Sequence, residues 1–156
     1  MNTTILGLDK NKTEELASEL NILLANFQVH YQNLRGLHWN IKGNNFFELH
    51  VKFEELYTDA QEKVDLIAER ILTLQGSPLH TFDDYTKLAT VPKGKDISND
   101  TKAVTLIVKS LGMLVSLERA ILESSEDAND EGTNSMMSDF ITEQEKTIWM
   151  MNAWLG

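Results

Sequence analysis

Between residues 38 and 69, five side chains have the types and the spacing of metal ligands. Two are imidazoles and three are carboxylates: His38, His50, Glu54, Asp65 and Glu69. Imidazole nitrogen combined with carboxylate oxygen suits iron, manganese or zinc, whereas copper(I) prefers sulfur ligands. The sequence therefore predicts a site for one of the first three metals.

Four of these residues form two pairs, each with a spacing of four. His50 is followed by Glu54, and Asp65 by Glu69. This spacing places both members of a pair on one face of an α-helix. His50 directly follows Leu49, an apolar position of the same stretch, and one residue corresponds to a rotation of about 100°. We therefore expect the pairs to flank the buried face of the helix.

The two pairs lie too far apart on one helix to hold a single small metal cluster. His50 and Asp65 are fifteen residues apart, which is about 22 Å at the helical rise per residue. If all five residues serve one site, a second subunit must bring its Asp65 and Glu69 to His38 and His50. A two-fold axis across this helix does so and generates two equivalent sites.

A simpler interpretation stays open at this point. A histidine four residues before a glutamate is commonly a solvated surface pair, and Glu62 and Lys63 fit a solvated face beside the second pair. The chain also lacks the Glu-x-x-His pair that di-iron bundles place on internal helix faces. Spacing alone thus argues against an internal di-iron centre and leaves a shared site or a metal-free surface.

Four blocks of apolar residues at helical spacing must position these ligands. They predict helices over residues 12–37, from Asn45 to Leu74, over residues 100–123, and over a last block that includes residues 137–155. Asn11 with Glu14, and Asn45 with Glu48, have the spacing of capping pairs at the first two helix starts.

The segments between these blocks predict the topology. A long connection over residues 77–99 includes TFDDYTKLAT, which can form a short helix, and the polar stretch SSEDANDEGTN forms a turn before the last helix. Two helical hairpins joined by a long crossover are a ferritin-like topology. We expect an all-α four-helix bundle with a short helix in the crossover between helices two and three, and one domain over residues 1–156.

Composition narrows the possible partners. The formal net charge is −10, and an acidic surface repels nucleic acid and anionic lipid. The chain has no cysteine, which excludes disulfides and thiolate metal sites. Neither a basic, apolar secretion signal nor an apolar run of membrane-spanning length is evident. These features predict a cytoplasmic protein without membrane association.

The stretches LHWNIKG, NFFELHVKFEEL and DLIAERI resemble the Dps family, the DNA-binding proteins from starved cells, which are mini-ferritins. The resemblance extends over the whole chain, and the intervals that separate the five candidate residues match those of the family's ferroxidase ligands. It implies a hollow dodecamer with ferroxidase sites at two-fold interfaces. His38, His50 and Glu54 would come from one subunit, and Asp65 and Glu69 from its partner. Glu54 departs from the pattern, because many members carry aspartate there.

The resemblance also implies a reaction. Iron is the implied metal, as Fe(II) that is oxidised to Fe(III), preferably by hydrogen peroxide, and mineralised inside the cage as protection against oxidative stress. Trp39, beside His38, would be a redox partner of the iron, with core packing as the alternative. Iron would enter through acidic pores, for which Asp127, Asp130 and Glu131 are candidates, and a solvated loop is the other interpretation of this run.

Two other functions stay as alternatives. The first is a nucleoid protein that acts by binding DNA, but the chain has no terminal tail rich in lysine or arginine. We therefore expect no appreciable binding to duplex DNA at physiological salt. The second is a metal-free bundle that serves only in assembly.

Overall fold

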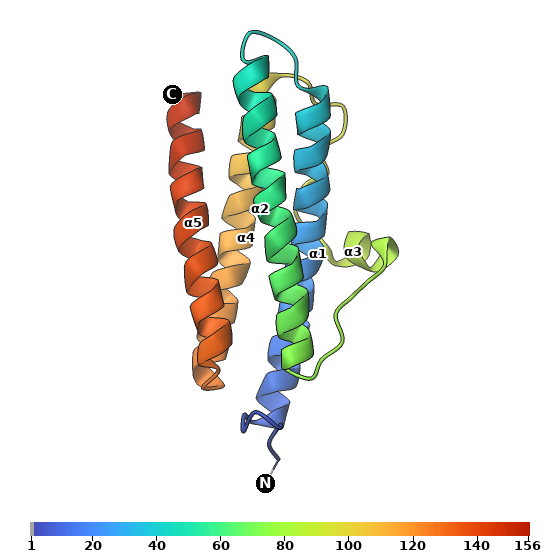
Figure 1. The fold of residues 1–156 in the computed structure, drawn as a ribbon, viewed down its shortest axis with the longest axis vertical. Helices are drawn as coiled ribbons and strands as arrows, with labels where there is room; N and C mark the ends of the chain where they lie inside the picture. The colour runs from blue at the N-terminus through green and yellow to red at the C-terminus, as the bar shows by residue number, and fades with distance from the viewer. Residues whose placement is uncertain (1) are drawn as a thin grey trace.

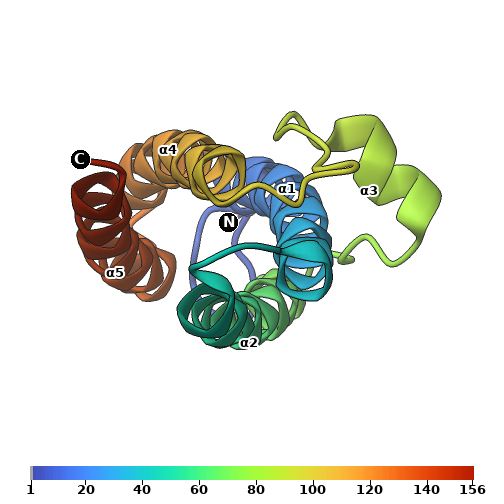
Figure 2. The ribbon, with the colours of Figure 1, turned by 90° about the horizontal axis from the view of Figure 1, so that it is seen from above.

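The computed structural model describes residues 2–156, which form five α-helices and no β-strand. The helices are α1 (Lys10–Asn40), α2 (Phe46–Thr73), α3 (Phe82–Leu88), α4 (Asp100–Asp127) and α5 (Glu131–Leu155). The four long helices run side by side as a bundle, and α3 lies outside it against α1 (Figures 1 and 2). The predicted all-α bundle with a short helix in the crossover is confirmed. No helix of residues 2–156 is long and apolar enough to span a membrane.

The bundle forms because each long helix buries one apolar stripe. In α2 the predicted stripe is on the inside, with Leu49, Phe53, Ile67 and Ile71 at 3% exposure or less. Helices α1 and α2 form one hairpin, α4 and α5 form the other, and α1 packs against α4. The candidate ligands on α2 are therefore carried on a helix that is fixed from its buried side.

Both predicted capping pairs are wrong. Asp9, not Asn11, caps α1, and its carboxylate accepts a hydrogen bond from the Lys12 amide at 3.0 Å. An aspartate at this position also interacts favourably with the helix dipole. Asn45 does precede α2, but its side chain donates to Asp100 Oδ2 at 2.8 Å and makes no cap bond. This hydrogen bond lowers the pKa of Asp100 and joins the starts of α2 and α4.

The predicted polar turn before the last helix is mostly helical. Helix α4 continues to Asp127 and α5 begins at Glu131, so residues 128–130 alone connect them. Asn129 adopts a φ of 57°, which ends α4 in the left-handed region that asparagine tolerates. Asp130 then caps α5. The polar residues before and after this connection are compatible with helix because several are exposed and the two buried ones, Ser125 and Thr133, are hydrogen-bonded.

Lys63 does not fit the solvated-face interpretation, because it is only 3% exposed, whereas Glu62, Asp65 and Glu69 are exposed. Its Nζ donates to Asp59 and to Glu143 of α5, each at 2.7 Å. Burial alone would lower the pKa of Lys63, but these two carboxylates outweigh the effect and raise it. The ammonium is thus kept charged between α2 and α5, where an unpaired charge would be costly.

A second buried polar pair joins α4 to α5. Glu118 is fully buried, and Gln144 Nε2 donates to its two carboxylate oxygens at 2.8 and 2.7 Å. Burial raises the pKa of Glu118 to about 9. At neutral pH this side chain is therefore a neutral acid inside the bundle.

Candidate metal centre

The hairpin of α1 and α2 brings His38 and His50 together. Their rings are stacked, with centroids 3.8 Å apart and planes 11° from parallel. His38 Nδ1 lies 2.6 Å from the carbonyl oxygen of His50, and His50 Nδ1 lies 2.8 Å from the carbonyl oxygen of His38. The two residues therefore fix each other through a reciprocal pair of hydrogen bonds.

This reciprocity determines which nitrogen of each ring can bind a metal. A carbonyl oxygen only accepts hydrogen bonds, so both Nδ1 atoms must carry their proton and donate. In the neutral ring the lone pair then belongs to Nε2, and neither Nε2 atom has a hydrogen-bond partner among residues 2–156. A hydrogen bond from the second ring nitrogen to a carbonyl is the usual way to orient a metal-binding histidine.

The backbone carbonyl of His38 can accept the hydrogen bond from His50 Nδ1 because it lies in the last turn of α1. Carbonyls at the end of a helix lack the amide donor four residues later. The amide of Lys42, which would be the donor, instead bonds to the carbonyl of Ser98 at 3.0 Å. The exit of the chain from α1 therefore leaves His38 free to accept the bond from His50.

Glu54 lies on the next turn of α2 after His50, with its side chain exposed. The hydroxyl of Tyr57 donates to Glu54 Oε1 at 3.3 Å, and the Tyr57 ring packs edge-on against His38 at 5.4 Å. Burial and the neighbouring Glu54 carboxylate raise the pKa of Tyr57. Tyr57 thus contacts both His38 and Glu54, a connection that the sequence analysis missed, although its spacing of three from Glu54 is a usable signal.

Asp65 and Glu69 are also exposed on α2, but one chain does not bring them to the histidines. Asp65 lines a groove between α1 and α2 together with Gln28, Tyr31 and Gln61. Within residues 2–156 there is no group of three or more histidine, aspartate or glutamate side chains close enough to hold one metal ion. The single chain therefore carries two separate parts of the predicted ligand set.

Trp39 is not a core residue of the chain, because 57% of it is exposed. The guanidinium of Arg35 lies over its ring, 4.9 Å from the centroid. The alternative of plain core packing is therefore wrong within one subunit.

The three acidic residues that are candidates for an iron pore differ in their surroundings. Asp130 is buried and binds Arg70 and Thr133, so its carboxylate is committed to joining α2 and α5. Asp127 forms an exposed ion pair with Lys12 at 2.9 Å. Glu131 is exposed in the first turn of α5. Asp130 is thus a structural residue rather than a free pore ligand.

Comparisons with known proteins give matches over most of the chain. The ferritin-like domain family matches residues 17–156. A DNA protection during starvation protein of Porphyromonas gingivalis is 39% identical over 150 residues, which cover 96% of this chain and 94% of that protein. An uncharacterised protein of Haemophilus influenzae is 48% identical over 98% of this chain and 96% of its own length.

The fold is also similar to a solved structure. The crystal structure of a Dps protein from Vibrio cholerae O1 has a TM-score of 0.98 and 49% identity, and the match covers 100% of this chain and 98% of that one. That protein is described as a member of a broad superfamily of ferritin-like diiron-carboxylate proteins.

Proposed function

Because this chain belongs to the Dps family of ferritin-like proteins, we propose that it oxidises ferrous iron at sites shared by two subunits and stores the ferric product in a hollow dodecamer. The observation that carries the proposal is the stacked pair of His38 and His50, in which neither Nε2 atom is hydrogen-bonded within the described residues 2–156. These nitrogens with Glu54 form one half of the site. Asp65 and Glu69 of the second subunit supply the other half.

The proposed donor set suits the reaction. Carboxylate oxygens favour Fe(III) over Fe(II), while neutral imidazoles hold Fe(II) and leave positions open for an oxidant. Two Fe(II) ions each lose one electron, and hydrogen peroxide takes both electrons with two protons. Its O–O bond breaks and two water molecules leave, so no hydroxyl radical is released.

In this reaction the residues of the chain fix the orientation of the ligand side chains. The reciprocal hydrogen bonds fix both imidazole planes before iron arrives, and such preorganisation lowers the cost of binding. Tyr57 restrains Glu54 beside them. A cytoplasmic location and protection against peroxide follow from this proposal as predictions.

Anaerobic Fe(II) titration, followed by peroxide, tests the proposal. We expect saturable Fe(II) binding, rapid oxidation on peroxide addition, and slower oxidation with dioxygen. His80→Ala is a matched control, because His80 is an exposed histidine in the connection after α2, and it should leave the rates unchanged. Oxidation no faster than in buffer alone would refute the ferroxidase proposal.

The name of the Porphyromonas gingivalis relative makes DNA binding the second candidate. The charge of this chain argues against it, since a net charge of −10 per subunit makes an assembled shell strongly anionic. Lys12, near the N-terminus, is paired with Asp127. We expect no shift of duplex DNA in a gel assay at physiological salt, and a retarded band under that condition would overturn this prediction.

A further inference from the structure

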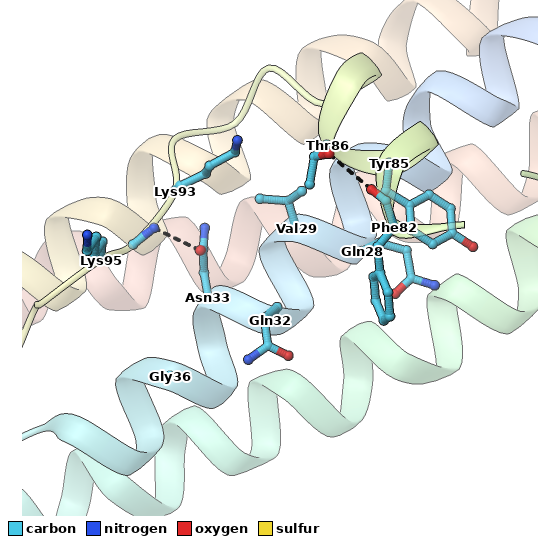
Figure 3. Close-up of a pocket in the computed structure, with 11 residues that line it drawn as sticks. Gln28, Val29, Gln32, Asn33, Gly36, Phe82, Tyr85, Thr86, Lys93 and Lys95 are labelled. Atoms are coloured by element: carbon cyan, nitrogen blue, oxygen red, sulfur yellow. Dashed lines mark hydrogen bonds between the residues drawn. The ribbon is translucent and has the colours of Figure 1, made fainter. Parts of the chain in front are cut away.

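Helix α2 carries Asp65 and Glu69, the acidic half of the proposed site, yet it packs extensively against only one other helix. Within residues 2–156 this neighbour is α1, which itself packs against α2, α4 and α3. The crossover fixes α1 further, because the Gly94 amide donates to Asn33 Oδ1 at 2.9 Å (Figure 3). The ring of long helices in Figure 2 places α5 on the other side of α2. The orientation of α2 on that side depends on the side chains that bridge the two helices.

Two long cationic side chains of α2 bridge this side. Arg70 Nε donates to Thr133 Oγ1 at 2.9 Å, and the Arg70 guanidinium pairs with Asp130, which caps α5. About two turns earlier on α2, Lys63 Nζ donates to Glu143 Oε2 at 2.7 Å. Every hydrogen bond and ion pair that joins α2 to α5 or to its cap within residues 2–156 involves one of these two cations. Arg70 and Lys63 therefore form two polar ties between α2 and α5.

The tie at Arg70 lies in a space that Gly132 leaves open. A Cβ atom at Gly132 would lie 2.7 Å from Arg70 Nη2 and 2.9 Å from Arg70 Cζ, whereas carbon atoms pack at about 3.5–4.0 Å. The Arg70 side chain is 18% exposed and that of Asp130 is 2% exposed. A pair so far removed from water is costly to break, because removal of one partner leaves an unpaired charge. The contact is thus part of the packing between the helices rather than a mobile surface pair.

The two ties bracket the acidic pair. Asp65 lies two residues after Lys63, and Glu69 directly precedes Arg70. Both carboxylates are exposed, and neither has an ion-pair partner among residues 2–156. The two candidate histidines, by contrast, are fixed by their own hydrogen bonds. The direction of the two carboxylates therefore follows the rotation of α2, which the ties fix.

A small rotation of α2 would misplace this pair. With its side chains an α-helix has a radius of about 5–6 Å, so a rotation of about 10° moves a carboxylate by about 1 Å. A displacement of about 1 Å in a catalytic arrangement can lower a rate by about a hundredfold. The ties can thus act on the site without contacting iron, because they hold the helix that presents the carboxylates.

We propose that Arg70 is a positioning residue of the ferroxidase site, which sets the direction of Asp65 and Glu69 by fixing α2 against the start of α5. Lys63 supports the same arrangement from the other side of the acidic pair. This inference rests on the proposed function, in which the two carboxylates complete the site of a second subunit. It also gives the buried Asp130 an indirect role in iron oxidation, through the guanidinium that it holds.

Arg70→Met/Asp130→Asn removes the tie without leaving an unpaired buried charge, and asparagine can still cap α5. We expect weaker Fe(II) binding and peroxide-dependent oxidation slowed by about tenfold or more, as for loss of a group that orients a metal ligand. Circular dichroism and light scattering verify the fold and the assembly. Arg119→Met/Glu145→Gln is the matched control, because it removes an exposed ion pair between α4 and α5. It should keep the wild-type rate.

Gly132→Ala displaces the Arg70 guanidinium and retains every charged and polar group. The added Cβ takes the space that the guanidinium occupies, and alanine has a higher helix propensity than glycine. We expect slower oxidation in a variant whose α5 is intrinsically no less stable, so loss of helix stability would not explain the effect. Wild-type oxidation rates in both this variant and the double variant would show that Arg70 does not position the ligands.

Co-assembly separates a positioning role from a general loss of stability. His38→Ala/His50→Ala chains keep the acidic half of the site. Asp65→Ala/Glu69→Ala chains keep the histidine half, so each complete site in a mixture takes one half from each variant. The Arg70 double substitution should slow oxidation when the first variant carries it and have no effect when the second does.

Equal losses in the two placements would overturn the positioning role, because a general structural defect does not depend on which half of the site its chain supplies. A mixture that is inactive before the tie is removed, although its subunits exchange, would contradict the shared site itself and with it this inference. The two failures are therefore distinguishable in one set of stopped-flow measurements.

Discussion

Replacing His38 and His50 together by alanine should lower the rate of peroxide-dependent Fe(II) oxidation by about a hundredfold or more, while the assembly stays intact. The two rings provide every nitrogen donor of the proposed site, and they stack on each other, while the Nδ1 of each ring bonds to the backbone carbonyl of the other residue. Loss of one ring removes a ligand and the stacking partner of the second ring, although the backbone carbonyl that orients the second ring remains. Stopped-flow absorbance at ferric wavelengths measures the rate, and light scattering verifies the mass.

Co-assembly then tests whether the site is shared. The His38→Ala/His50→Ala variant keeps the acidic half, and an Asp65→Ala/Glu69→Ala variant keeps the histidine half. In a pair formed from one subunit of each kind, one site has all its ligands and the other has none of the four. Random mixing in equal amounts should thus restore about one quarter of the wild-type sites.

The outcome of mixing shows whether the ligands of one site come from two chains. Two inactive variants that become active together can do so only if ligands come from different chains. If subunits exchange, as shown by mass spectrometry, and activity stays at the level of each variant alone, the ligands belong to separate sites. The ferroxidase proposal would then need a different ligand set.

Glu118→Gln should make the protein more stable at alkaline pH and should flatten the dependence of stability on pH. Burial raises the pKa of Glu118 to about 9 from an ordinary value of 4.5. Between these values the folded protein keeps a proton that the unfolded chain releases. Stability therefore falls as pH rises through this window, by up to about 1.4 kcal/mol per pH unit.

Glutamine removes this titration and keeps the contact, because its amide can still accept the hydrogen bond from Gln144. At pH 8 we expect the variant to exceed wild type by about 2 kcal/mol or more in free energy of unfolding, with little difference near pH 4.5. Denaturant unfolding at several pH values measures this. Glu123→Gln, at an exposed position of the same helix, is the control. If the free energy of unfolding of Glu118→Gln depended on pH as steeply as that of wild type, the raised pKa of Glu118 would be contradicted.

The sequence was sufficient for the helices, the topology and a testable hypothesis of a shared site. Helical periodicity and the apolar stripe are local properties, so they place His50 and Glu54 beside a buried face without knowledge of the fold. The separation of His50 from Asp65 follows from the fixed rise of a helix. The ligand types likewise follow from residue chemistry alone.

The tertiary structure decided which faces and side chains meet. Lys63 is polar, yet packing of α2 against α5 buries it between Asp59 and Glu143. The reciprocal bonds of His38 and His50 join backbone and side chains of two helices. Such contacts link residues far apart in the chain, and their geometry is set by how whole helices pack. Periodicity along one helix carries no information about that packing.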